Sequence, residues 1–71
     1  MNKALLHFEQ ATGLGPTKAA LLLGVAYVTY AQVRSGARPL QKYHARHMEA
    51  ILLLPQATLR RLIQEHVNGS D

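Results

Sequence analysis

Cysteine is absent from this chain of 71 residues, which excludes disulfides and thiolate metal sites and fits a reducing cytoplasm. The longest apolar run, residues 19–28, is too short for a membrane-spanning helix, which needs roughly 20 residues. The opening MNKALLHFEQ lacks the apolar segment and the cleavage site of a signal peptide. We therefore expect a cytoplasmic protein with no membrane partner.

Acidic residues are few, and they are scattered over the chain. They are Glu9, Glu49, Glu65 and Asp71. No two of them are spaced to act as acid and base on one surface. Neither serine lies in a nucleophile-elbow motif, and the glycines at 13 and 15 lack the lysine and spacing of a phosphate-binding loop. His44 and His47 supply only two of the three or four ligands that zinc takes. We predict no enzyme, cofactor, metal or small-molecule substrate.

The shortage of acids leaves eight Lys and Arg against four Asp and Glu, a formal net charge of +4. An anionic partner is therefore expected, either nucleic acid or an acidic protein surface, and charge alone does not separate the two. Four cations follow one another with no acid between them: Arg34, Arg38, Lys42 and Arg46. They form either an ordinary solvated face or a surface that contacts phosphates or carboxylates.

The first half of the chain carries the start and end signals of three short helices. Asn2 caps a helix over residues 3–11, with Phe8 as a core anchor and with Glu9 and Gln10 at the border of its wet side. Proline at position 16 opens a second helix that ends at Gly24. After the buried hinge residue Val25, a third helix over 26–35 closes at a glycine.

Two more helices complete the predicted fold. Proline at position 39 starts the longest helix, 39–54, with an apolar stripe opposite a polar face. The stripe holds Leu40, Met48, Ile51 and Leu52, and the polar face holds Lys42, Arg46 and Glu49. His44 falls on the stripe and His47 at its rim. Proline 55 begins the last helix, 56–66. We predict one compact five-helix domain over 1–67 and a flexible tail over 68–71.

Two short helices around a glycine, as predicted over 16–35, are typical of the helix-turn-helix unit. Over about residues 12–65 the chain resembles the phage Cro and repressor class of helix-turn-helix proteins, in TKAALLLGVAYVTYAQVRSGARPL followed by HARHMEAILLLP. In that class an alanine packs near the turn glycine, here Ala20 and Gly24, before an apolar residue, here Val25. A later apolar position falls on Tyr30 or Val33, and a G-x-R-P connection on 36–39. The resemblance implies an all-α domain with a helix-turn-helix core.

The recognition helix departs from this class at the positions that usually face bases. They are Ala26, Tyr27, Val28, Ala31 and Gln32. Direct readout needs side chains that hydrogen-bond to base edges, and only Gln32 has this capacity, with Tyr27 a weaker second. Leu21 and Leu22 are also apolar where a solvated helix usually carries a polar residue. Left exposed, such leucines would form a patch typical of protein contact.

The size of the chain and its opening MNKALLHFEQATGLG also resemble small phage transcription regulators, known from a Xanthomonas phage, that bind host RNA polymerase. This resemblance implies attachment near the amino terminus of the polymerase β′ subunit. It further implies inhibition of initiation through loss of the sigma factor, together with antitermination, in the cytoplasm of an infected bacterial cell.

We therefore predict a phage transcription regulator that binds host RNA polymerase through seven residues. They are Tyr27, Val28, Gln32, Arg34, Arg38, Lys42 and Arg46. The cations would pair with acidic groups or make weak, nonspecific contacts with nucleic acid, and the apolar pair would be the desolvated anchor. One alternative is a sequence-specific Cro-like repressor that binds operator half-sites about one helical turn apart. A structural or assembly helper is a third possibility, because small helical domains serve many functions.

Overall fold

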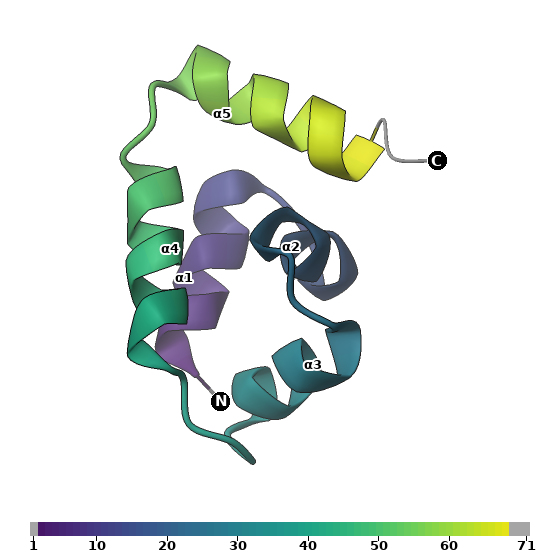
Figure 1. The fold of residues 1–71 in the computed structure, drawn as a ribbon, viewed down its shortest axis with the longest axis vertical. Helices are drawn as coiled ribbons and strands as arrows, with labels where there is room; N and C mark the ends of the chain where they lie inside the picture. Colours follow the sequence, from purple (N-terminus) through teal and green to yellow (C-terminus); the bar gives the residue numbers. More distant parts are fainter. Residues whose placement is uncertain (1, 69–71) are drawn as a thin grey trace.

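A computed structural model describes residues 2–68 and contains five α-helices followed by a π-helical turn, with no strand among these residues (Figure 1). The elements are α1 (Lys3–Thr12), α2 (Pro16–Leu23), α3 (Tyr27–Ser35), α4 (Lys42–Leu52), α5 (Gln56–Ile63) and η1 (Gln64–Asn68). The predicted all-α domain of five helices is confirmed. No helix within the described range has both the length and the apolar character to cross a bilayer.

The starts and ends of the first three helices follow the local signals in the sequence. The Asn2 side chain accepts hydrogen bonds from the amides of Ala4 and Leu5, at 2.9 and 3.3 Å, and so caps α1. Helix α2 ends where Gly24 adopts a φ of 73°, which a residue with a Cβ rarely adopts. Helix α3 ends in the same way at Gly36. These predictions are confirmed, although Val25 is only half-buried.

Helix α4 begins three residues later than proline 39, where the sequence predicted it to begin, and ends at Leu52. The amide of Arg38 bonds back to the carbonyl of Gln32 at 3.1 Å. Residues 39–41 have no regular secondary structure, and Leu40 among them packs, half-buried, against the core from outside the helix. Burial of Leu40 therefore overrides the helix-starting preference of the proline. Met48 and Ile51 are buried, as the predicted stripe requires.

The last predicted helix, 56–66, divides into α5 and the π-helical turn η1. Asn68, which the prediction assigned to the tail, ends this turn, and positions 69–71 of that tail lie outside the described residues. A π-helix is rare because its hydrogen bonds reach five residues back instead of four. Here the turn coincides with the burial of Val67 in the core.

The core lies between α1, α2 and α4 and is closed by α3 at one end and by α5 with η1 at the other (Figure 1). Phe8 is fully buried at its centre, which confirms its predicted role as an anchor. Removing such a ring from a core typically costs about 3–5 kcal/mol. That cost is comparable with the whole free energy of unfolding of a small domain, so the stability of this domain leaves little margin for the loss of a core side chain.

One carboxylate is buried among these apolar side chains and joins α1 to α3. Glu9 accepts a hydrogen bond from the Tyr30 hydroxyl at 2.7 Å and from Arg34 Nε at 2.8 Å, both at Oε2. Arg34 Nη2 donates to its other oxygen at 3.1 Å. A buried charge is tolerated only when it is paired and hydrogen-bonded in this way. The sequence placed Glu9 at the edge of the wet side, and that prediction is wrong.

The network also fixes the ionisation of its members. Burial raises the pKa of Glu9, but the hydrogen bonds from Arg34 and Tyr30 and the Arg34 charge outweigh burial, so the pKa lies below its ordinary value of 4.5. Burial, together with the bond to the Glu9 carboxylate and its negative charge, raises the pKa of Tyr30 above its ordinary range. The phenol therefore stays a hydrogen-bond donor at physiological pH.

We expect Tyr30→Phe to destabilise the protein by about 2 kcal/mol, because it removes a buried hydrogen bond to a charged acceptor. Tyr43→Phe is the matched control: its ring is exposed, so the same loss of a hydroxyl should change the free energy of unfolding by less than about 0.5 kcal/mol. Urea unfolding of both variants measures the difference. Equal effects of the two substitutions would show that the buried bond adds nothing.

We expect the stabilising effect of Glu9 to depend on pH. Its folded-state pKa lies below the unfolded value of 4.5, so its contribution is complete above that value and is lost as the pH falls through the folded-state pKa. Wild type should therefore exceed Glu9→Gln in free energy of unfolding at about pH 7, and the gap should narrow on acidification to about pH 3. A gap that is constant with pH would contradict this account.

Candidate functional site

The exposed start of α3 is the most conspicuous apolar feature among the predicted site residues. Tyr27 and Val28 occupy the first turn of the helix and are 52% and 67% exposed. Tyr30 and Val33 are buried. At about 100° per residue Val28 lies on the side of α3 opposite Tyr30, whereas Tyr27, three residues before Tyr30, lies near the side of Tyr30 but in the exposed first turn. The packing of α3 therefore directs its first turn outward, as the sequence predicted for a contact surface.

Gln32 lies one turn after Val28 on the same side of α3 and is half-buried. The backbone carbonyl oxygen of Gln32 accepts a hydrogen bond from the backbone amide of Arg38 at 3.1 Å. This bond brings the start of the connecting segment against the end of α3. The structure thus brings Tyr27, Val28, Gln32 and Arg38 onto α3 and its immediate continuation. Ala31, beside them, adds no polar group.

Arg34 has a different environment from the other predicted cations. Its guanidinium forms the two bonds to Glu9, and its side chain is only 26% exposed. Hydrogen bonding to Glu9 raises the pKa of Arg34 further. Because Glu9 neutralises this charge, the main role of Arg34 is to link α1 to α3. The sequence analysis grouped Arg34 with the cations available to a partner, and its ion pair with Glu9 corrects that prediction.

Three of the predicted cations are exposed: Arg38, Lys42 and Arg46. Lys42 and Arg46 are four residues apart on α4 and share one side of that helix. The ion pairs among the described side chains are Arg34–Glu9 and Arg61–Glu65, and these three cations take part in neither. Glu49 is three residues beyond Arg46 on α4, so a negative charge borders the group.

The pairing of Glu9 with Tyr30 and Arg34 was missed at the level of sequence, although one signal was present. Glu9 follows Leu5 by four residues and Phe8 by one, which places a carboxylate on the apolar side of α1. Tyr30 and Arg34 are likewise one helical turn apart. That two donors on α3 face this acid depends on how the two helices pack, and no spacing within one helix reveals it.

The two histidines that the sequence offered as metal ligands have different surroundings on α4. His44 is half-buried, with its ring centroid 4.2 Å from that of Tyr43, whereas His47 is exposed. Within residues 2–68, no three His, Cys, Asp or Glu side chains gather as a metal would require.

The predicted site residues offer two kinds of interaction. The start of α3 can lose water against an apolar partner, and the three exposed cations can attract an anionic one.

Comparisons of the chain with models of known protein families, with curated proteins and with solved structures find no match.

Proposed function

We propose that α2 and α3 form a helix-turn-helix unit of the Cro and repressor type. Two short helices joined by three residues, with Gly24 in the left-handed conformation, support this proposal. Ala20 is buried beside the turn, and its carbonyl accepts the amide of Val25 at 3.0 Å. This is the position at which the resemblance requires a small residue.

We propose that the protein is a phage transcription regulator that acts on a protein partner, bacterial host RNA polymerase. The observation that carries the proposal is the exposed first turn of α3. In DNA-binding members of this class that turn faces base edges, but here it presents an aromatic ring and a branched aliphatic side chain, Tyr27 and Val28. Exposed apolar side chains of this kind support a protein interface better than base readout.

The exposed cations provide the second part of the interaction. Arg38, Lys42 and Arg46 would attract an acidic surface of the polymerase, or nucleic acid held by it, and would add rate and orientation more than affinity. By its resemblance to the phage regulators, the target is the amino-terminal part of the β′ subunit. Binding there would inhibit initiation through displacement of the sigma factor and would promote antitermination. We place this activity in the bacterial cytoplasm and assign no catalysis to it.

The alternative is a sequence-specific Cro-like repressor. Gln32 favours this alternative, because its amide is on the same side of α3 as Val28 and can hydrogen-bond to an adenine edge. The Tyr27 hydroxyl would be a second, weaker reader. Such a protein would bind a palindromic operator as a dimer.

For polymerase binding, we expect Arg38→Glu to raise the Kd for host core polymerase about fivefold at low salt. The effect should shrink as salt is added, because exposed charges are screened. Arg60→Glu is the matched control: it makes the same charge change at an exposed position on α5, and we expect at most a twofold effect. Calorimetry measures the Kd of each variant for the polymerase. Equal Kd values for the two variants would contradict the assignment of Arg38 to the interface.

A gel-shift titration against fragments of the phage genome separates the two functions. A polymerase-binding protein should give only weak complexes that dissolve at moderate salt, because such complexes rest on phosphate contacts. A discrete complex with one fragment that survives added salt, and is lost in Gln32→Ala, would support the repressor instead.

A further inference from the structure

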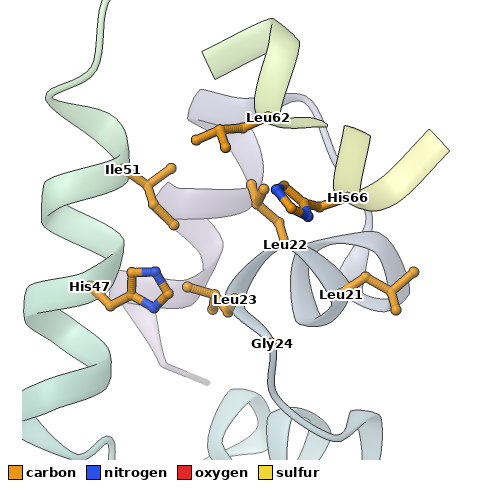
Figure 2. Close-up of a pocket in the computed structure, with 8 residues that line it drawn as sticks. All are labelled: Leu21, Leu22, Leu23, Gly24, His47, Ile51, Leu62 and His66. Atoms are coloured by element: carbon orange, nitrogen blue, oxygen red, sulfur yellow. The ribbon is translucent and has the colours of Figure 1, made fainter. Parts of the chain in front are cut away.

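A hollow of about 330 Å³ opens between α2, α4 and the α5–η1 end of the molecule (Figure 2). Its apolar wall is formed by Leu21, Leu22, Ile51 and Leu62. Leu22 and Ile51 belong to the core, but Leu21 is 50% exposed. An open apolar wall of this kind gains free energy when a partner removes it from water.

Two imidazoles stand at this hollow. Figure 2 shows His47 and His66 extending from α4 and η1 toward the leucines of α2. Both residues are exposed. A histidine ring carries at least one N–H donor in either protonation state, so both can donate to an acceptor that enters the hollow. Together they provide polar contacts beside an otherwise apolar wall.

The charges around the hollow favour an anion. None of the residues among 2–68 that line it is acidic. Lys18 precedes Leu21 and Leu22 by three and four residues on α2 and therefore lies on their side of that helix. The nearest acid on η1, Glu65, is paired with Arg61 at 3.2 Å. A carboxylate that arrives here meets the two imidazole donors and lies on the side of α2 that carries Lys18.

The volume fits one large apolar side chain. A cavity of about 150 Å³ lined by Leu, Ile and Phe side chains holds a benzene molecule, and this hollow is about twice that size. It therefore has room for a phenylalanine or leucine side chain and part of the chain that carries it. A free small molecule with these properties would need many more buried contacts for tight binding.

We propose that this hollow binds an acidic amphipathic peptide segment of the protein partner. A phenylalanine or leucine of the segment would lie against Leu21 and Leu62, and a neighbouring carboxylate would accept hydrogen bonds from His47 and His66. The proposal rests on the proposed function in one respect, namely that the segment belongs to RNA polymerase. It adds a contact surface distinct from the start of α3 and names the chemistry that the partner presents to it.

The first test uses three acetylated and amidated peptides: EEFLEE, KKFLKK and EEAAEE. Methyl NMR signals of Leu21, Ile51 and Leu62 report binding. We expect EEFLEE to bind saturably at these methyl groups and the other two peptides to bind at least tenfold more weakly. The double variant His47→Glu with His66→Glu should reverse the preference in favour of KKFLKK. Equal binding of EEFLEE and KKFLKK to wild type, or no shift at these methyl groups, overturns the proposal.

The matched control is the double variant His7→Glu with Gln41→Glu, which introduces two carboxylates at exposed positions outside the hollow. It should bind EEFLEE within twofold of wild type. A single variant, Leu21→Glu, alters the half-exposed wall and should also weaken EEFLEE binding tenfold. Sedimentation tests whether a second copy of the chain occupies the hollow instead. A wild-type dimer that dissociates in the His47→Glu, His66→Glu variant would assign the hollow to a second copy and overturn the proposal.

The second test measures the Kd of the same variants for host core polymerase. Tenfold weaker binding by the His47→Glu, His66→Glu variant, with the control unchanged, supports the proposal. Unchanged binding by that variant overturns it and leaves the proposed function intact. If wild type binds EEFLEE as expected but does not bind polymerase, the proposed function fails, while the peptide chemistry of the hollow is supported.

Discussion

The buried carboxylate of Glu9 is the interaction on which the position of α3 depends. A charge inside a small apolar core is costly unless each of its oxygens has a donor, and here Tyr30 and Arg34 supply three hydrogen bonds between them. Apolar contacts tolerate small rotations of a helix, whereas these bonds do not. They fix the rotation of α3 about its axis, and with it the direction in which Tyr27 and Val28 face.

This constraint changes what the surface can do. Arg34 is held by Glu9, and the exposed start of α3 is mainly apolar, so among the predicted site residues the exposed positive charge is carried by Arg38, Lys42 and Arg46. A surface divided in this way has one part that attracts a partner from a distance and another that holds it after water has left. A reader of base sequence would instead combine both properties in the same side chains.

Local signals predicted most of the fold, because they act within one helical turn. Glycines 24 and 36 ended their helices as expected, and Phe8 was recognisable as the core anchor. The delayed start of α4 was not predictable, since it follows from where Leu40 packs. At the site, the exposure of Val28 agrees with helical periodicity, whereas that of Tyr27, three residues before the buried Tyr30, does not follow from it. The pairing of Arg34 and the hollow beside His66 depend on contacts between helices distant in sequence, which no single-helix pattern contains.

The backbone of Asn2 has a practical consequence for work on this protein. Its amide donates to the carbonyl of Arg34 at 2.9 Å, so the beginning of α1 lies directly against the end of α3. At the other end, η1 carries His66, which lines the hollow. An affinity tag or fluorescent fusion joined ahead of α1 would lie near the end of α3, away from Tyr27 and Val28, and one joined behind η1 would crowd the hollow. The position of the label therefore decides whether the hollow remains open to a partner.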